Sequence, residues 1–419
     1  MNFHELQTEI EKYLYMEDEG MSRIALAAVV ATQLRLGDPV WLVLIGPSSS
    51  GKSQVLRPLA LTDKSIHRVD DLTENTFLSG IRISKGSKDI SLLKRIGPIG
   101  IIVISDFTVI FSKSPEARAA ILSQLRMVYD GEMVKFSGNN SEPVSWKGYL
   151  GILAGSTPSI YAHFEETADM GERFIYYRMK SYNIEKATRR SLSRTIFGKH
   201  LDATLSELYR EYIYGAVKSV GDEAITVPID AYERIVEISM FAALLRTPIH
   251  YDKFQKAIDR VPVSEMPMRI AGQLFAIAKG LMVLSHYDTG QWVLEEKDIE
   301  HIEWCAYSLA NEERRACLRV CASLSYDTPI RTQTIADTIG LSTAITGVIL
   351  QHLAAIGILN RAGDASGLTW KLASEVTWST IRRLEGIKGV SQDILEREVS
   401  LEEEEEQAAV ADQLFDDFK

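Results

Sequence analysis

Residues 41–53 read Trp-Leu-Val-Leu-Ile-Gly-Pro-Ser-Ser-Ser-Gly-Lys-Ser, and this stretch decides the fold. The apolar run predicts a buried strand, and the glycine-flanked pattern ending in Lys-Ser is typical of a phosphate-binding loop between a strand and a helix. Gly46 and Gly51 allow the backbone N–H groups to turn inward, so that a polyphosphate lies against them and the helix N-terminus. The expected nucleotide-binding residues are Gly46, Pro47, Ser48, Ser49, Ser50, Gly51, Lys52 and Ser53.

Side chains at the ends of three predicted strands carry the expected chemistry. Lys52 is expected to contact the β- and γ-phosphates, and the Ser53 hydroxyl to ligate Mg²⁺. Asp106 follows the apolar run 101–104, where an acidic residue holds Mg²⁺ or activates water. Thr157 follows another apolar strand and is placed to orient the attacking water, although both Asp106 and Thr157 also suit ordinary turns. The sequence therefore predicts ATP and Mg²⁺ as cofactors.

The first half of the chain alternates between strands and helices. Apolar strands are predicted at 101–104 and 149–154, and a helix at 115–129 lies between them in the sequence. A hairpin is expected from arms at 132–136 and 143–147. The alternation predicts an α/β fold with a parallel sheet that helices cover on both faces.

Composition and charge indicate a water-soluble protein of two or three domains. No apolar run in the 419 residues approaches the roughly twenty that span a bilayer, and the N-terminus lacks the apolar core of a signal peptide. We therefore expect no membrane partner. The three cysteines have no partners at zinc-site spacing, which predicts packed thiols and a reducing cytoplasm.

The negative charge is concentrated at the end of the chain. Residues 391–419 contain eleven acidic and two basic side chains, a net charge of −9, so residues 1–390 carry −2 of the total of −11. A nearly neutral body neither requires nor excludes a DNA partner. The tail ends with acids interleaved with Leu414, Phe415 and Phe418, a pattern that suits either docking into a basic, apolar groove of a partner protein or a disordered solubilising tail.

Three short motifs and the predicted hairpin together resemble the ATPase module of the AAA+ family. The motifs read Gly-Lys-Ser-Gln at 51–54, Ser-Asp-Phe at 105–107 and Gly-Glu-Arg-Phe at 171–174, and Pro-Met-Arg-Ile at 267–270 best matches the family's second sensor. The likeness is to minichromosome-maintenance helicases and their relatives on phages and mobile elements, and it covers roughly residues 38–290. It implies that Arg173 is an arginine finger and Arg269 a second sensor. A finger supplied by a neighbouring subunit implies a homo-oligomeric ring, expected to be a hexamer, whereas the ordinary alternative for Arg173 is a surface salt bridge.

One position departs from the pattern of this family. The family usually has Asp-Glu before the Phe, with Asp on Mg²⁺ and Glu as the base that activates water, whereas this chain has Ser105 and Asp106. Asp106 is then either the base, with Ser105 near the metal, or the metal residue with the base absent. Because an aspartate is one methylene shorter, slow hydrolysis or an ATP-gated switch stays open.

The resemblance implies an AAA+ parallel-sheet core with an α-helical lid. The sequence beyond it predicts a winged-helix domain and an acidic tail. The winged helix rests on two helices joined by a tight turn and followed by a small hairpin, between 330 and 371. In chain order, the expected segments are an N-terminal helical segment at 1–37, the ATPase core at 38–184, the lid at 185–310, the winged helix at 311–385 and an acidic, disordered tail at 386–419.

Basic side chains near the predicted hairpin are candidates for contacts with DNA phosphates. In related helicases, this hairpin and an insertion between the first two core strands face a central channel. The candidates are Lys85, Lys88, Lys94, Lys135 and Lys147. The second helix of the winged helix, at 342–356, contains no Lys or Arg, so DNA contact and protein docking both stay open for that module.

These features predict an ATP-hydrolysing motor that acts on DNA as a helicase, translocase or helicase loader in phage or mobile-element replication. The alternative is an ATP-switched regulatory or scaffolding protein with little turnover. In that case, the winged helix and the tail are interaction modules.

Overall fold

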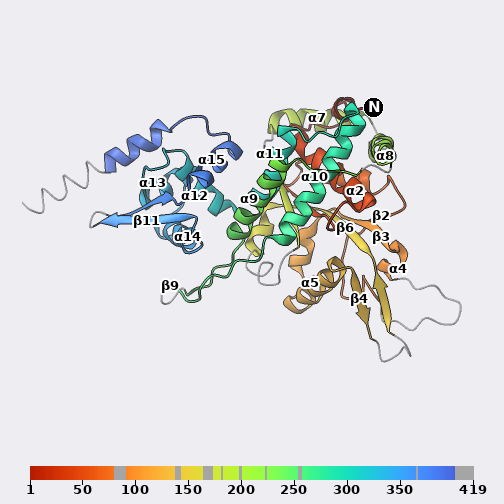
Figure 1. Ribbon diagram of the computed structural model, residues 1–419, viewed down its shortest axis with the longest axis horizontal. Helices are drawn as coiled ribbons and strands as arrows, with labels where there is room; N and C mark the ends of the chain where they lie inside the picture. The colour runs from red at the N-terminus through yellow and green to blue at the C-terminus, as the bar shows by residue number, and fades with distance from the viewer. Residues whose placement is uncertain are drawn as a thin grey trace, which may run out of the picture. The chain divides into compact units, whose positions relative to one another are not determined.

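The computed structural model contains two compact units (Figure 1). Unit 1 comprises Met1–Met240 and Met266–Leu309, and unit 2 comprises Phe241–Glu265 and Ala310–Lys419. Every candidate site residue that the structure describes lies in unit 1. The described residues are 1–79, 91–136, 143–163, 173–180, 183–197, 201–221, 224–252, 257–364 and 367–401.

A parallel sheet of five strands forms the centre of unit 1 and confirms the predicted α/β fold. The strand order is β2-β3-β6-β1-β7, and every neighbouring pair is parallel. All five residues of β1 are buried, as expected for a strand covered on both faces. The strands are β1 (Trp41–Ile45), β2 (Ile66–Arg68), β3 (Ile99–Ile104), β6 (Tyr149–Ser156) and β7 (Ile175–Arg178).

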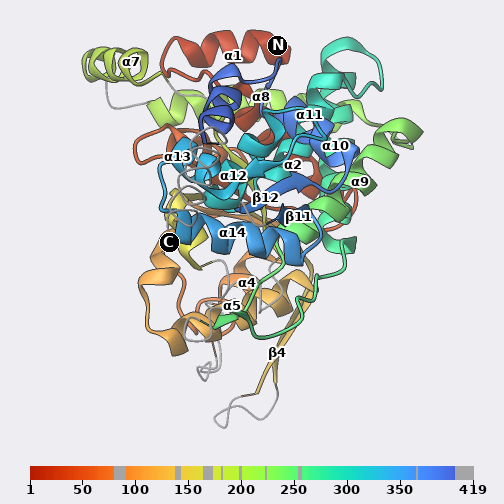
Figure 2. The same cartoon turned by 90° about the vertical axis from the view of Figure 1, so that its left-hand side faces the viewer.

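Helices lie on both sides of this sheet. The helices α2 (Glu19–Leu34) and α10 (Met268–Thr289) pack against each other on one side, and α5 (Pro115–Tyr129) lies on the other (Figures 1 and 2). Gly280 allows the close approach of α10 to α2, because a Cβ there would lie 2.3 Å from the Ala27 carbonyl oxygen. Helix α3 (Lys52–Leu59) follows β1 and contacts β3 and β6.

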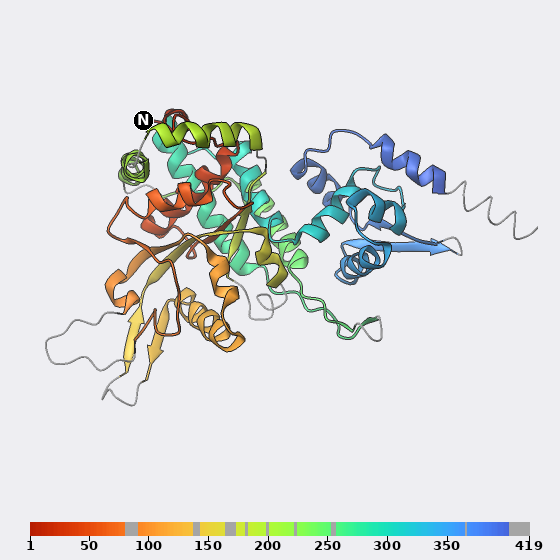
Figure 3. The ribbon, with the colours of Figure 1, turned by 180° about the vertical axis from the view of Figure 1, so that it is seen from behind.

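The remaining elements of unit 1 surround this core. The hairpin of β4 and β5 projects away from the sheet (Figure 3). Its arms match the predicted ones to within a residue at each end. The elements are α1 (Phe3–Glu11), α4 (Leu92–Ile96), η1 (Phe107–Ser112), β4 (Glu132–Lys135), β5 (Val144–Lys147), η2 (Pro158–His163), α7 (Ile184–Phe197), α8 (Leu201–Ser219) and α11 (Glu296–Tyr307). Helix α9 (Ile229–Leu245) begins in unit 1 and ends in unit 2.

Helix α10 is long and apolar enough to cross a membrane, but 67% of its most apolar window is buried inside the protein. Twelve of its residues, between Ile270 and Ser285, are buried. These buried positions make α10 a core helix of unit 1.

Unit 2 contains a small antiparallel sheet of order β10-β12-β11 together with several helices. Trp370 is fully buried in it, and its indole N–H donates to the Thr332 hydroxyl at 2.8 Å. The elements are β8 (Tyr251–Asp252), β9 (Ala257–Ile258), α12 (Glu312–Ala322), β10 (Ile330–Arg331), α13 (Thr332–Ile339), α14 (Thr343–Ala355), β11 (Leu359–Asp364), β12 (Gly367–Leu372) and α15 (Glu375–Leu384).

The beginning of the acidic tail is ordered. The sequence predicts disorder from residue 386, whereas residues 392–401 are helical. Ile394 is buried, and Glu398 forms a 2.8 Å ion pair with Arg331. Burying an apolar side chain and a paired carboxylate favours order over a solvated coil. The five consecutive glutamates and the Leu-Phe ending of the tail lie outside the described residues.

Candidate functional site

The loop between β1 and α3 has an unusual backbone. Ser49 has φ +64° and Gly51 has φ +93°, values that a β-carbon disfavours, so the strain at Ser49 marks this turn as specialised. The Gly46 N–H donates to the Ser156 carbonyl at 3.2 Å, which ties the start of the loop to the end of β6. A Cβ at Gly46 would lie 2.8 Å from the Ser50 hydroxyl oxygen, so a larger residue would displace the loop. The loop is therefore tightly built around small residues.

The ammonium group of Lys52 lies inside this loop. Its side chain is 8% exposed, and Nζ donates to the carbonyls of Gly46 at 2.8 Å and Pro47 at 2.6 Å and to the Ser50 hydroxyl at 3.2 Å. Burial lowers the pKa of Lys52 to about 8, although the negative charge of Asp106 acts in the opposite direction. A half-desolvated cation enclosed by a strained loop is suited to an anion with several oxygen atoms.

Asp106 and Ser105 directly follow β3. The Asp106 carboxylate is exposed and caps η1, where it accepts from the Thr108 N–H at 3.0 Å and also from the Thr108 hydroxyl. The Ser105 hydroxyl oxygen is buried and has no hydrogen-bond partner within the described part of the chain. A Cβ at Gly155 would lie 2.7 Å from the Ser105 carbonyl oxygen, so the glycine allows β6 to approach this point. Ser105 adjoins Asp106 in the sequence, and hydroxyl and carboxylate oxygens are both ligands that Mg²⁺ accepts.

Thr157 follows β6, the strand between β3 and β1. Its hydroxyl and the Ser159 hydroxyl are 2.6 Å apart. Since the strands are parallel, their carboxyl ends lie at one edge of the sheet, here called the carboxyl edge. The structure therefore places Lys52, Asp106 and Thr157 at the same edge, where open α/β sheets bind ligands.

Arg173 lies at the opposite edge, where the strands begin, here called the amino edge. It precedes β7, and its guanidinium is 3.3 Å from the Asp130 carboxylate and 5.7 Å from the centre of the Tyr129 ring at the end of α5. The side chain is 8% exposed, and burial lowers the pKa of Arg173. Five residues of β1, from Trp41 to the start of the loop, separate the two edges by about 16 Å at the rise of a β-strand.

Arg269 lies near Arg173. It is exposed in the first turn of α10, and its positive charge contributes to the lowered pKa of Arg173. One turn later, the Gln273 side chain accepts from the Trp41 N–H and donates to the Arg173 carbonyl, both at 2.8 Å. The structure thus brings the two predicted arginines together, away from the phosphate loop of their own chain.

The DNA candidates are in different environments. Lys94 on α4 and Lys147 on β5 are exposed. The Lys135 ammonium instead donates to the Asn75 side chain at 2.8 Å and to the Leu78 carbonyl at 3.1 Å, so it connects the hairpin to the chain that follows β2. Lys85, Lys88 and the tip of the predicted hairpin lie outside the described residues.

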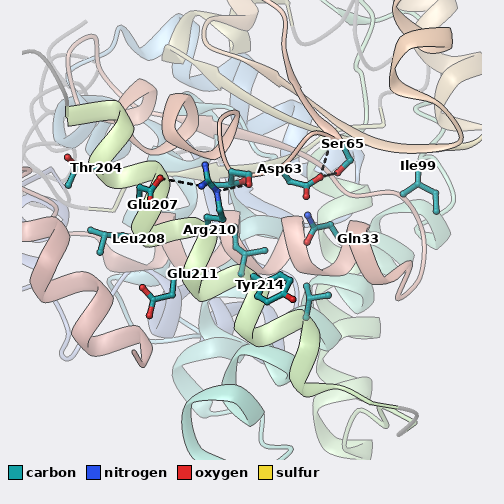
Figure 4. A pocket seen from close by; sticks show the side chains of 13 residues that line it. Gln33, Asp63, Ser65, Ile99, Thr204, Glu207, Leu208, Arg210, Glu211 and Tyr214 are labelled. Atoms are coloured by element: carbon teal, nitrogen blue, oxygen red, sulfur yellow. Dashed lines mark hydrogen bonds and ion pairs between the residues drawn. The ribbon is translucent and has the colours of Figure 1, made fainter.

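A cavity of about 940 Å³ lies at the other end of α3, between the chain around Asp63 and helix α8 (Figure 4). Arg210 donates there to the carbonyls of Leu61 at 3.2 Å and Thr62 at 3.1 Å, and it pairs with Glu207 at 3.3 Å. The cavity does not include the phosphate loop. A second cavity of about 630 Å³ lies between the chain that follows α1 and the basic side chains of α7.

Comparisons with known proteins identify no family. No family model matches the chain, and no curated protein is significantly similar to it.

Sequence reasoning did not find Gln273 or Asp130, because both act through contacts between residues far apart in the chain. The polar Gln273 within the apolar helix 268–289 was the one signal available for the first of them.

The predicted metal ligands are Ser53, after the loop, and Asp106, after β3. Among the described residues, no group of three or more His, Cys, Asp or Glu side chains gathers as a metal site. The cysteines are free and buried, and burial raises the pKa of each thiol. A metal at the carboxyl edge would therefore be held mainly by hydroxyl groups, one carboxylate and the nucleotide itself, as Mg²⁺ is at many phosphate sites.

Proposed function

We propose that the protein binds and hydrolyses ATP in the loop between β1 and α3. The observation that carries this proposal is the buried ammonium of Lys52, which lies inside a strained loop with Asp106 and Thr157 at the same edge of the sheet. The loop residues 46–53 would hold the phosphates through backbone N–H groups and Lys52. Lys52 would then exchange its bonds to the loop carbonyls for bonds to phosphate oxygens.

The groups around Asp106 fit Mg²⁺. The Ser53 hydroxyl and the Asp106 carboxylate would hold the ion. The Ser105 hydroxyl, which has no hydrogen-bond partner among the described residues, directly precedes Asp106 in the sequence. Bound Mg²⁺ supplies positive charge against the phosphate oxygens. Asp106 also remains the candidate base for water, and Thr157 the candidate group that orients it.

The arginines at the amino edge support a homo-oligomer. Arg173 and Arg269 lie about 16 Å along β1 from the phosphate loop of their own chain, so they would act on the nucleotide of a neighbouring copy. A guanidinium beside the γ-phosphate neutralises charge in the transition state of phosphoryl transfer. Repeating this head-to-tail contact closes a ring, for which we propose six copies.

The proposed family is the AAA+ ATPases, in the group similar to minichromosome-maintenance helicases of phages and mobile elements. Residues 185–310 would form the lid, and 311–385 a winged helix. The succession of α13, α14 and the β11–β12 hairpin supports the second assignment. Residues 386–419 would form an acidic tail, ordered in its first part, that docks on a protein partner.

The proposed substrate is DNA, on which the motor would act as a helicase, translocase or helicase loader in the cytoplasm. The exposed Lys147 lies on β5 of the projecting hairpin, and the exposed Lys94 lies on α4. The Trp146 indole N–H of the hairpin donates to the Gly97 carbonyl at the end of α4 at 2.8 Å, so both lysines support this choice. Such phosphate contacts would be independent of sequence and sensitive to salt.

Two observations favour the second candidate function, an ATP-switched regulatory or scaffolding protein. The Asp106 carboxylate is held by Thr108, on the backbone and the hydroxyl, and its side chain is shorter than that of a glutamate base. The described helix α14 contains no Lys or Arg, so its surface favours a protein partner over DNA.

Hydrolysis rates with single-stranded DNA, with double-stranded DNA and without DNA, measured together with the mass of the assembly in ATP, test these candidates. The motor predicts assembly in ATP and hydrolysis that DNA stimulates. Assembly with negligible turnover in all three conditions would favour the switch. A strictly monomeric protein that binds no ATP would contradict both.

A further inference from the structure

The side chain of Gln273 connects the first residue of β1 to the segment that leads into β7, ahead of the first residues that pair between these two strands. The paired register of β1 and β7 begins at Leu42 and Ile175. One residue earlier on β1, Gln273 accepts from the Trp41 N–H, and its amide N–H donates to the Arg173 carbonyl, both at 2.8 Å. Both bonds require one orientation of the amide, with its oxygen toward Trp41 and its nitrogen toward Arg173.

This bridge is buried and well supported. Gln273 is 1% exposed, and both ends of its amide bond to backbone groups. The Trp41 ring lies 5.0 Å from the Phe174 ring and 5.2 Å from the Tyr129 ring, and Tyr129 in turn lies under the Arg173 guanidinium. A displacement of the Arg173 backbone would therefore also displace the contact between its guanidinium and Tyr129.

Gln273 also relates Arg173 to Arg269. The two positions 269 and 273 are one turn apart on α10 and therefore lie on the same face of the helix. The two bonds of Gln273 therefore tie the first turns of α10, and with them the backbone of Arg269, to the backbone of Arg173. At its other end, β1 continues directly into the phosphate loop.

We propose that Gln273 is a positioning residue that sets Arg173 and Arg269 for the nucleotide of a neighbouring copy. This inference rests on the proposed function, in which the two arginines act between copies. Gln273 itself contacts no nucleotide. Its effect is large because a misplacement of about 1 Å, far from the chemistry, can reduce a rate by about 10²-fold.

Two substitutions separate the bonds of this side chain. Gln273→Glu keeps an oxygen that accepts from Trp41 but loses the N–H that donates to Arg173, and Gln273→Met removes both bonds with little change of volume. The matched control is Ser285→Ala, since Ser285 is also a buried polar residue of α10, 2% exposed. kcat and KM for ATP are measured on the assembled protein, with thermal unfolding of each variant.

Gln273→Glu is expected to lower kcat at least tenfold, by about the factor that misplacement costs, with KM for ATP within about twofold of wild type. The phosphate loop of the same copy is intact, which is why KM is retained. Gln273→Met is expected to lower kcat further, and Ser285→Ala to behave as wild type. A Gln273→Glu protein that unfolds with the wild-type midpoint and retains wild-type kcat would overturn the inference.

Mixed assemblies separate this inference from the function on which it rests. Gln273→Glu copies supply intact phosphate loops, and Asp106→Asn copies supply intact arginines, so mixing two weakly active variants should restore part of the rate. Restoration by Arg173→Ala copies but not by Gln273→Glu copies would show that Gln273 acts within its own copy, against the inference. An Arg173→Ala protein with wild-type kcat would instead contradict the proposed function itself.

Discussion

The carboxyl and amino edges of the sheet in unit 1 differ in what they offer to a nucleotide. At the carboxyl edge, Lys52 is enclosed by its own loop and Asp106 by its own turn, so both groups are held by residues close in sequence. At the amino edge, Arg173 is held by Asp130 and Gln273, which come from distant parts of the chain. The groups at the carboxyl edge are therefore positioned by local structure, whereas Arg173 at the amino edge is positioned by the tertiary fold.

The difference is also one of completeness. The carboxyl edge has the loop between β1 and α3, an acid and Arg178, the last residue of β7, which contacts the Tyr161 ring. The amino edge has Arg173 and Arg269 but not that loop. Under the proposed function, each edge carries part of what phosphoryl transfer needs. Joining the carboxyl edge of one copy to the amino edge of the next would complete the site.

The largest effect is expected from a substitution that changes the carboxyl edge alone. Lys52→Ala removes the cation that contacts the phosphates, so we expect ATP affinity or turnover to fall by more than about 100-fold, since hydrogen bonds to charged groups contribute about 1.5–3 kcal/mol each. Binding of a fluorescent ATP analogue and the hydrolysis rate measure this loss, and circular dichroism checks the fold. Wild-type affinity and rate in this variant would remove the basis for the carboxyl edge as the nucleotide site.

A change of pH tests the role of Lys52 at the carboxyl edge without a mutation. Burial lowers the pKa of Lys52 to about 8, and adjacent phosphates would raise that pKa, so binding above this pH takes up a proton. ATP affinity should therefore be constant below about pH 8 and fall as pH rises, by up to about tenfold per unit. Titration calorimetry from pH 6.5 to 9.5, in buffers of different ionisation enthalpy, reports both quantities.

The control for this pH dependence is Lys52→Arg. An arginine stays protonated through the whole range, so any affinity that this variant retains should not depend on pH above 8. A wild-type affinity that is flat from pH 7 to 9.5 would show that the state of Lys52 does not govern binding.

The smallest expected effect concerns the amino edge. Asp130 is 59% exposed and pairs with Arg173 at 3.3 Å, so this bond must be exchanged when Arg173 meets a phosphate. Because the Asp130 carboxylate is largely exposed although Arg173 is buried, the pair contributes little, and Asp130→Asn should raise the hydrolysis rate by at most about fivefold. A steady-state assay at saturating ATP measures this change. A rate that falls instead would show that Asp130 positions the arginine.

Much of the fold follows from local sequence patterns. The helix predicted at 115–129 is found as Pro115–Tyr129, with the Ser114 hydroxyl capping its start, because a Ser-Pro entry and an apolar face act locally. The loop between β1 and α3 was predictable for the same reason. β7 was not predicted, since Ile-Tyr-Tyr-Arg is too short and too mixed to show a strand period.

The parts of the site that depend on long-range contacts were less accessible. Lys135 was a candidate for DNA, yet it is engaged with Asn75, sixty residues away in sequence. Gln273 connects residues separated from it by 232 and 100 positions, and no local pattern reports such a contact. Sequence reasoning named Arg173 and Arg269 only through a family resemblance, and their shared location required the three-dimensional fold.

The most direct test of the account joins the two edges in trans. Arg173→Ala copies keep an intact phosphate loop, and Asp106→Asn copies keep intact arginines, so each variant alone should bind ATP and hydrolyse it poorly. Hydrolysis is measured across mixing ratios at constant total protein. We predict a hydrolysis rate that passes through a maximum near equal amounts of the two variants and exceeds the rate of either variant alone. A rate that interpolates linearly between the two variants at every ratio, with assembly confirmed, would contradict it.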